Sequence, residues 1–413
     1  MNNTAGRWVA VAWLVAALGA GSTQAAEAPD LLDTLHANRV LSDAQYEALK
    51  QQRTATPHWP GIDGYIQFDA PLAVGNDTRL GSRTNLRRFY VHVHDGIAPG
   101  WSYTTTFGYF DGKPYFTDGS VTYAGFGGLA VTGGYFKEPF SLSYLTSPKD
   151  LLFPERPLPV MALVPGKKIG LQLATHGARW SLAAGVFGGA YDQTADAAPG
   201  VAGRWGESLR ATITPWLRPA GLWEVGASYA WREADSDHKL SFGYLPESFT
   251  VGTKLANTPT ITGVSWFSTA GVETRLQVGA FSLQSEYLMA HVERDEAPAL
   301  SLPGWYAQAG WSLTGESRRY DPTTGTVGGL TPRRTLSAGG AGAWELAARY
   351  SALDLNNGGV SGGFERNASA GVNWYPEKPL KFMLDAIRVL PVRGGIDAGV
   401  ATTIVMLRLQ AAY

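Results

Sequence analysis

The sequence predicts an all-β protein, a transmembrane antiparallel β-barrel of about 16 strands, preceded by a short N-terminal helical segment. The chain ends on an aromatic residue, Tyr413, and its last strand alternates between apolar and polar residues. Segments of roughly ten residues with the same alternation recur from Tyr65 onward. Such strands need hydrocarbon on one face and water on the other, which is the pattern of a barrel in a membrane.

The last strand shows both faces. Leu407 and Leu409 share the face of Tyr413, whereas Arg408 and Gln410 lie on the opposite face. Because an arginine that faces lipid is costly, we expect Arg408 to point into a water-filled interior.

The composition agrees with this fold class. The 413 residues include 50 glycines, 14 tryptophans and 18 tyrosines, yet the mean hydropathy is only -0.10, because alternation averages apolar against polar residues. A membrane protein built from helices would be far more apolar. The chain has no cysteine, which excludes a disulfide framework and a thiolate metal site.

The N-terminus has the features of a secretory signal peptide. An apolar run over residues 8–20 follows a single charge, Arg7, and precedes the small residues of the sequence TQAA. The run is too short to span a bilayer as a helix. We expect residues 1–26 to be removed, which takes one of the 34 basic residues and leaves 33 against 35 acidic residues. This global charge favours neither an anionic nor a cationic partner.

Residues 27–61 differ from the rest and are predicted to form a periplasmic helical segment and its linker. Residues 30–52 carry leucines at helical spacing, and Ser42 with Gln45 forms a capping box before a second helix. We expect the apolar stripe of these two short helices to pack on a neighbour or to self-associate rather than to bind a cofactor.

Residues 62–413 are predicted to form the barrel. Tryptophans recur at the ends of alternating segments, as an aromatic girdle requires; examples are Trp223, Trp231, Trp305 and Trp311. A soluble β-sandwich, the alternative, would not place tryptophan at strand ends. The predicted strands lie near residues 64, 85, 100, 118, 128, 168, 179, 205, 221, 264, 280, 304, 341, 366, 379 and 400.

The connections alternate between short and long, which separates a periplasmic from an extracellular end. Short turns are predicted at residues 95–100, 176–178 and 215–221, and long loops at residues 137–165, 188–204 and 233–263. Residues 316–340 break this rule, because they fall on the short-turn end although they are long. Either this turn is extended, or the strand count is wrong by one hairpin there.

Several specific motifs follow one another along the chain. They are NLRR at 85–88, GYFKEPFSL at 134–142, LTSPKD at 145–150, ER at 155–156, LTGESR at 313–318, GAWELAARYS at 342–351 and NWY at 373–375. In these motifs the chain resembles the phosphate-selective porin O and P family. The resemblance implies a sixteen-stranded outer-membrane barrel, usually a homotrimer, with an inward-folded third loop at residues 137–165 and a basic constriction that strips water from an anion.

The resemblance predicts a water-filled channel for small anions in the bacterial outer membrane, preferring phosphate or similar oxyanions. The expected partners are small anions such as phosphate, outer-membrane lipid and further copies of the chain in a homotrimer, with no nucleic acid and no cofactor. The alternatives are a general diffusion porin of weak selectivity and a structural barrel that tethers partners through residues 30–52. The best-known phosphate-specific members carry a dense arginine ladder, which residues 218–245 lack.

Positive charge is concentrated where a pore would narrow. Residues 137–168 carry five basic and three acidic side chains in a chain that is slightly acidic as a whole. In a narrow throat of low dielectric, the field of a few cations is focused and raises the local anion concentration. We expect Lys137, Lys149 and Arg156 to line this constriction; the alternative is that they lie on a solvated loop.

Arg87 and Arg88 complete the expected anion-binding constriction. Arg88 shares parity with His92 and should point into the lumen, whereas Arg87 has the lipid parity. An arginine facing lipid at mid-depth costs roughly 2–4 kcal/mol. Either a β-bulge turns both side chains inward, as the family pattern favours, or Arg87 reaches the rim of the membrane.

No catalytic arrangement is predicted. His92 and His94 share a strand face, but the sequence shows no third metal ligand at suitable spacing. We therefore expect a channel and not an enzyme.

Overall fold

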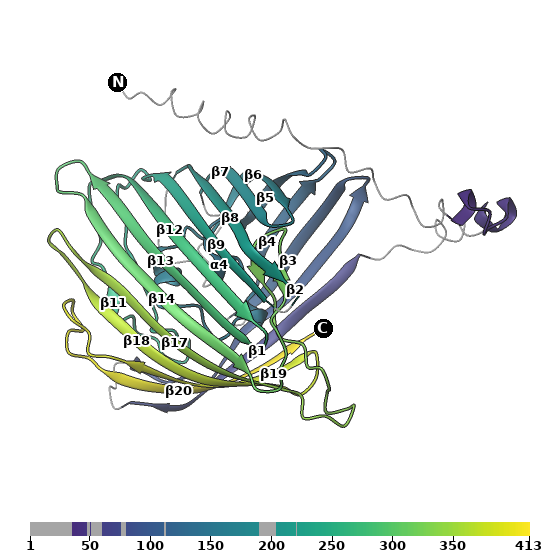
Figure 1. Cartoon of the computed structure of the whole chain (residues 1–413). Helices are drawn as coiled ribbons and strands as arrows, with labels where there is room; N and C mark the ends of the chain where they lie inside the picture. Colours follow the sequence, from purple (N-terminus) through teal and green to yellow (C-terminus); the bar gives the residue numbers. More distant parts are fainter. Residues whose placement is uncertain are drawn as a thin grey trace, which may run out of the picture.

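Sixteen strands close into one antiparallel barrel in the computed structural model, which describes residues 35–47, 50, 60–75, 80–110, 113–189, 204–219 and 221–413 (Figure 1). The strands of the barrel are β1 (Gly61–Val74), β2 (Asn85–Ala98), β3 (Trp101–Phe110), β4 (Lys113–Tyr123), β5 (Leu129–Lys137), β6 (Lys167–Gly177), β7 (Trp180–Phe187), β8 (Gly206–Arg218), β9 (Gly221–Glu233), β12 (Val264–Val278), β13 (Phe281–Arg294), β14 (Leu300–Ser312), β17 (Ala343–Asn357), β18 (Val360–Tyr375), β19 (Leu380–Val389) and β20 (Thr402–Ala412). β1 pairs with both β2 and β20, which closes the barrel. The predicted fold class and strand number are confirmed, whereas the predicted signal peptide, residues 1–26, lies outside the described residues.

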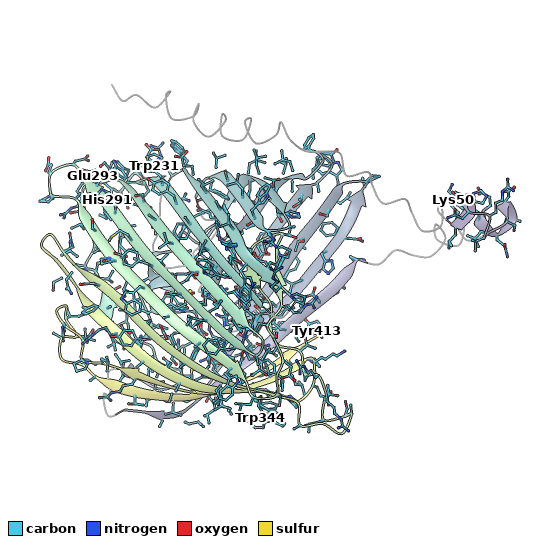
Figure 2. The ribbon with its side chains drawn as sticks, in the orientation of Figure 1. Lys50, Trp231, His291, Glu293, Trp344 and Tyr413 are labelled. Atoms are coloured by element: carbon cyan, nitrogen blue, oxygen red, sulfur yellow. The ribbon has the colours of Figure 1, made fainter. Side chains whose placement is uncertain are left out.

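The two faces of the wall follow the predicted alternation. On β20 the outward side chain of Leu407 is exposed, whereas Arg408 is buried toward the lumen. Trp344 and Tyr413 lie at one end of the barrel and Trp231 at the other, where two aromatic girdles would meet the membrane surfaces (Figure 2). The outer surface therefore presents an apolar band to lipid.

Hairpin lengths distinguish the two ends of the barrel. At the end that holds Tyr413, only residues 99–100 join β2 to β3, and only residues 178–179 join β6 to β7. At the opposite end, residues 138–166 join β5 to β6, and residues 234–263 join β9 to β12; we call these inner loop A and inner loop B. Short turns mark the periplasmic end of bacterial barrels, so Tyr413 lies at that end.

The long segment on the periplasmic end is an extended turn, so the strand count stands. Residues 313–342, called here the periplasmic insert, join β14 to β17 and contain the small hairpin of β15 (Tyr320–Asp321) and β16 (Thr326–Val327). The hairpin lies inside the barrel (Figure 1). Its tip touches the lumen wall, because Arg210 of β8 donates to the carbonyl oxygens of Thr324 (2.6 Å) and Gly325 (2.8 Å).

Inner loop A also lies inside the barrel and is held there by wall side chains. It contains α4 (Leu142–Leu145), the 3-10 helix η3 (Pro148–Asp150) and α5 (Leu158–Leu163). Lys381 of β19 donates to the carbonyl oxygen of Leu151 (2.6 Å), and the backbone N–H of Leu142 donates to Glu273 of β12 (2.9 Å). Charged residues of the lumen face therefore satisfy the backbone of the loop, which would otherwise be buried without partners.

An apolar core fills one side of the lumen. Its buried members include Phe140, Leu158, Val160, Met161 and Leu163 from inner loop A, Leu240, Phe242, Tyr244 and Ile261 from inner loop B, and Phe267, Leu288, Val292, Leu302 and Leu353 from β12, β13, β14 and β17. Inner loop B adds a two-stranded sheet of β10 (Gly243–Tyr244) and β11 (Ala256–Asn257). The half of the barrel formed by these strands is packed with side chains.

The N-terminal segment is helical over residues 35–37 and 43–47. The predicted capping box is present: the N–H of Ser42 donates to Gln45 Oε1 (3.0 Å), and the N–H of Gln45 donates to Ser42 Oγ (3.3 Å). Across the described ranges, no helix has the length and apolar character needed to cross a bilayer.

A charge on the outward face of β20 should impair insertion. Leu407→Arg is expected to destabilise the folded barrel by roughly 2–4 kcal/mol, because the side chain lies near the middle of the apolar band. Gln410→Lys, on the lumen face, should have a smaller effect. Guanidinium unfolding in phospholipid vesicles measures both, and equal destabilisation would contradict the assignment of the two faces.

Candidate functional site

A cavity of about 230 Å³ lies between inner loop A and the wall formed by β1 to β6; we call it the basic cavity. Its lining residues are Tyr65, Arg88, Tyr90, His92, Thr104, Thr106, Thr117, Asp118, Lys137 and Lys167 from the wall and Tyr144, Leu145, Ser147, Pro148, Arg156 and Met161 from the loop. Four of these side chains are cationic and one is a carboxylate. The basic cavity lies on the side of the lumen away from the strands that hold the apolar core.

Lys137 and Lys167 face this cavity because of a gap in the strand pairing. β4 pairs with β5 only through residues 119–123, so residues 113–118 of β4 have no partner on β5. Lys137 and Lys167 are register partners at the ends of β5 and β6. The Lys167 ammonium instead bridges toward β4 and donates to Asp118 Oδ2 (2.7 Å). Lys137 donates to the carbonyl oxygens of Tyr144 (2.7 Å) and Leu145 (3.3 Å).

The structure places a β-bulge at Arg87. Gln67 of β1 pairs with Arg88 and Phe68 pairs with Leu86, so Arg87 has no partner residue on β1. The extra residue turns both arginines inward, where their side chains are 1% and 3% exposed. The alternative, that Arg87 extends along the lipid face to the rim, is wrong.

Both arginines bind one carboxylate of inner loop A, Glu155. Arg87 Nε lies 2.7 Å from Glu155 Oε1, Arg88 Nη2 lies 3.0 Å from Oε2, and Arg408 Nη2 lies 2.7 Å from Oε1. Arg408 also pairs with Asp69 of β1 (2.6 Å). This network joins the loop to β2, β1 and β20. The pairing of β1 with β20 closes the barrel.

The pKa of Glu155 reflects this arrangement. Burial alone raises the pKa of this carboxyl, but the positive charges of Arg87, Arg88 and Arg408 outweigh burial and hold the pKa well below its usual range. Glu155 is therefore ionised throughout the neutral and mildly acidic range, and the loop stays attached there.

Arg156 organises inner loop A from within. Its guanidinium donates to the carbonyl oxygens of Ser143 (2.9 Å), Tyr144 (3.1 Å) and Thr146 (2.6 Å), at the C-terminal end of α4. Three of its donors are thus used by the backbone. Its positive charge nevertheless lies at the edge of the basic cavity.

A second cavity, of about 530 Å³, opens on the periplasmic side and is called here the exit vestibule. Its charged lining residues are Lys149, Asp150, Arg319, Asp321, Lys378 and Lys381. Cations outnumber carboxylates there as well. Because Pro148 lines the basic cavity and Lys149 lines the exit vestibule, η3 lies between the two spaces.

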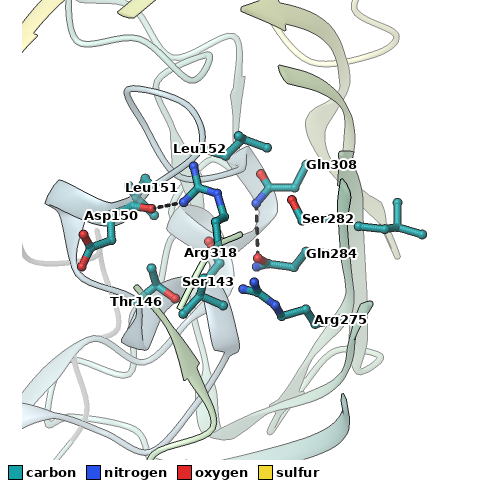
Figure 3. Close-up of a pocket in the computed structure, with 12 residues that line it drawn as sticks. Ser143, Thr146, Asp150, Leu151, Leu152, Arg275, Ser282, Gln284, Gln308 and Arg318 are labelled. Atoms are coloured by element: carbon teal, nitrogen blue, oxygen red, sulfur yellow. Dashed lines mark hydrogen bonds between the residues drawn. The ribbon is translucent and has the colours of Figure 1, made fainter. Parts of the chain in front are cut away.

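The periplasmic insert and inner loop A touch beneath η3. Arg318 Nη1 donates to the carbonyl oxygen of Asp150 (2.7 Å), as Figure 3 shows, and its remaining nitrogens bind the Glu345 carboxylate of β17 (2.9 and 2.7 Å). Arg275 and Arg318 both line a small cavity of about 20 Å³ at this contact, which has room for one water molecule.

The five residues expected at the constriction lie in three places. Arg88, Lys137 and Arg156 line the basic cavity, and Lys149 lines the exit vestibule. Arg87 lies against Glu155 of inner loop A and beside the Phe249 ring, 3.6 Å from its centroid. The sequence interpretation did not select Lys167 and Asp118. Their positions depend on where the pairing of β4 with β5 ends. The only sequence signal for them is that Lys137 precedes inner loop A and Lys167 follows it, so the two lysines face each other across the loop.

The chain is similar to known outer-membrane proteins over most of its length. Residues 69–413 match the family described as "Phosphate-selective porin O and P". Porin O of Pseudomonas aeruginosa is 27% identical over 362 residues, which cover 78% of this chain and 80% of that protein. An uncharacterized protein of Caulobacter vibrioides is 28% identical over 342 residues, which cover 80% of this chain and 68% of that protein.

Solved structures share the fold. An anion-selective porin from Comamonas acidovorans matches with a TM-score of 0.51 and 12% identity, covering 86% of this chain and 99% of that one. OprB of Pseudomonas putida matches with a TM-score of 0.50 and 11% identity, covering 89% of this chain and 97% of that one. The chain is an outer-membrane porin and belongs to the phosphate-selective porin O and P family.

Proposed function

We propose that the basic cavity is the selectivity constriction of this channel and that it passes small anions with a preference for phosphate-like oxyanions. The observation that carries the proposal is the charge of the lining around a space of about 230 Å³, within a chain of net charge -1. Arg88 pairs with Glu155 and Lys167 with Asp118, whereas Lys137 and Arg156 have no carboxylate within ion-pair distance in the part of the chain that the structure describes. Low-dielectric walls focus this positive field, which concentrates anions in the narrow space.

The donors around the cavity can replace part of an oxyanion's hydration shell. An ammonium has three N–H donors, and among the described residues two carbonyl oxygens accept from Lys137, so one donor remains for a ligand. The hydroxyls of Thr104 and Thr117 line the same space. Charge-assisted hydrogen bonds of this kind favour a hydrated oxyanion over chloride, which offers no separate acceptor oxygens.

Asp118 gives a reason for preferring phosphate. A carboxylate can accept a hydrogen bond but cannot donate one when ionised. Near neutral pH phosphate still carries P–OH groups, whereas sulfate carries none. Asp118 can therefore accept from bound phosphate and repel sulfate, while its contact with Lys167 keeps its own charge compensated.

The exit vestibule extends the route, since Lys149, Arg319 and Lys378 continue the positive potential toward the periplasm.

The homotrimer is part of this proposal too. The longest run of short strands is β3 to β7, with 8–11 residues each, against 13–16 for β12 to β18; β19 and β20 are also short, with 10 and 11. We propose that the wall formed by β3 to β7 faces the threefold axis.

Reversal potentials across a salt gradient test the proposal. Lys137→Ala should shift the reversal potential of single channels toward cation preference and weaken the block of chloride current by phosphate about tenfold, the scale of one charge-assisted hydrogen bond. Asp118→Asn should raise the block by sulfate toward that by phosphate. Both effects should diminish at high ionic strength.

Lys113→Ala is the matched control, since it removes the same charge from an exposed lysine at the extracellular end of β4. It should leave selectivity and phosphate block unchanged. If Lys137→Ala behaves like this control in a folded barrel, the chain is a general diffusion porin. If the wild-type protein shows no conductance, it is a structural barrel.

A further inference from the structure

Three arginines lie on the outer face of the barrel near its extracellular end. Arg366 and Arg388 alternate with buried lumen residues on β18 and β19, so both side chains point outward. Arg388 pairs in register with Ala368, two residues beyond Arg366 on the neighbouring strand. Arg393 bridges to Phe364, which has the same parity as Arg366. The three side chains therefore share one outer patch, which we call the arginine patch.

The arginine patch has no acidic counterpart. Among the residues that the structure describes, none of its arginines has a carboxylate within ion-pair distance, whereas other rim cations do: Arg204 pairs with Glu233 at 3.8 Å. Asp354, which pairs in register with Phe364, is engaged by the N–H of Asn356 (3.0 Å). The patch therefore carries an uncompensated positive charge.

Two of the arginines are already oriented by neutral acceptors. Arg366 donates to the carbonyl oxygen of Pro391 (3.4 Å), and its guanidinium lies 5.1 Å from the centroid of Phe364. Arg388 donates to Thr403 Oγ1 of β20 (3.1 Å). These contacts use few of the five donors of each guanidinium, and the others remain available to an anion.

The depth of the patch corresponds to the outer membrane surface. Thr403 is the register partner of Arg388 and lies ten residues before Tyr413, which marks the periplasmic girdle. Ten residues of a strand tilted by about 40° rise roughly 25 Å, which is the height of the apolar band. The lipid-facing Leu384 and Leu407, both exposed, lie below the patch.

We propose that the arginine patch binds the phosphorylated headgroup of a glycolipid of the outer leaflet. The guanidinium groups would bind the headgroup phosphates by paired hydrogen bonds, and the acyl chains would lie along the apolar wall formed by β18 to β20. A lipid fits this site better than a free anion does, because the charged patch and the apolar surface adjoin on the membrane face.

Native mass spectrometry of the full-length protein in detergent, titrated with diphosphoryl lipid A, tests this inference. The double variant Arg366→Gln/Arg388→Gln should bind lipid A roughly thirtyfold more weakly, since each basic residue near an anionic headgroup contributes about fivefold. The control Lys113→Gln/Arg294→Gln removes equal charge from one exposed and one half-buried site at the extracellular end and should change binding less than about threefold.

The other arms distinguish the sources of phosphate. Dephosphorylated lipid A should bind wild type and the arginine variant equally, and inorganic phosphate should not displace lipid A. The inference is overturned if the double variant binds like wild type, if the control loses as much affinity, or if inorganic phosphate competes. Unchanged single-channel conductance of the double variant shows that the barrel is folded and separates this site from the constriction.

Discussion

Glu155→Gln is expected to release inner loop A from the barrel wall and to destabilise the protein by about 3–5 kcal/mol, the scale of breaking a buried ion pair. The substitution removes the Glu155 carboxylate from the buried guanidinium groups of Arg87 and Arg88, whereas Arg408 keeps its pair with Asp69 (2.6 Å). Because the loop then no longer constricts the lumen, single-channel conductance should rise and anion preference should fall.

Glu233→Gln makes the same chemical change in an exposed pair, where Glu233 lies 3.8 Å from Arg204. It should shift stability by less than about 0.5 kcal/mol. Conductance in planar bilayers and guanidinium unfolding in vesicles measure both variants. Wild-type conductance and stability in Glu155→Gln would show that the network does not hold the loop.

The same network predicts the response of the wild-type channel to acid. Since the pKa of Glu155 is held well below its usual range, its stabilising contribution is complete above the ordinary glutamate pKa of about 4.3 and is lost only as the pH falls through the lower, folded-state value. Loop-dependent selectivity should therefore persist at a pH where an ordinary glutamate is half protonated.

Excision of residues 319–328, replaced by a short turn, should raise conductance several-fold. The hairpin of the periplasmic insert crosses the lumen below inner loop A and docks on β8, where Thr214 hydrogen-bonds Tyr320 (3.0 Å). After its removal Arg210 remains paired with Glu273 (2.5 Å), so the wall keeps its own ion pair while the exit widens.

A milder variant tests the docking alone. Gly325 has a positive φ of 59°, and a Cβ there would lie 2.9 Å from Thr212 Oγ1, so Gly325→Val should undock the hairpin tip and raise conductance without a deletion. Deletion of residues 336–339, the exposed part of the same insert, should leave conductance unchanged. If the excision of residues 319–328, Gly325→Val and the deletion of residues 336–339 all give the same conductance, the hairpin does not limit the passage of ions through the barrel.

The wall of the barrel could be predicted from sequence because its physical cause is local. Alternation along residues 402–412 or 221–233 reports lipid on one face and water on the other, whatever the rest of the chain does. The same rule failed for Arg87, whose parity points to lipid, because a bulge adds one residue and reverses its side. The energetic penalty of an arginine in lipid and the family pattern both favour the bulge from sequence.

The interior could not be predicted in the same way, because its contacts join distant parts of the chain. In the sequence Glu155 belongs to the ER motif and is one of three acids in residues 137–168, yet its partner Arg408 lies 253 residues away. Glu247 of inner loop B was not singled out, although it binds Arg349 of β17 at 3.1 Å. Many charged residues of the lumen wall hold the inner loops, as Lys381 and Glu273 hold inner loop A.

The apolar core inside the barrel has a consequence for biogenesis. Leucines and phenylalanines of the two inner loops resemble the residues that face lipid, so hydrophobicity alone cannot direct them to the interior while the sheet is still open. Their ionic neighbours can: Glu155 and Glu247 would be left unpaired in hydrocarbon but find arginines in the lumen. The buried charges thus act as a sorting signal, which keeps the loops on the correct side until the first and last strands meet.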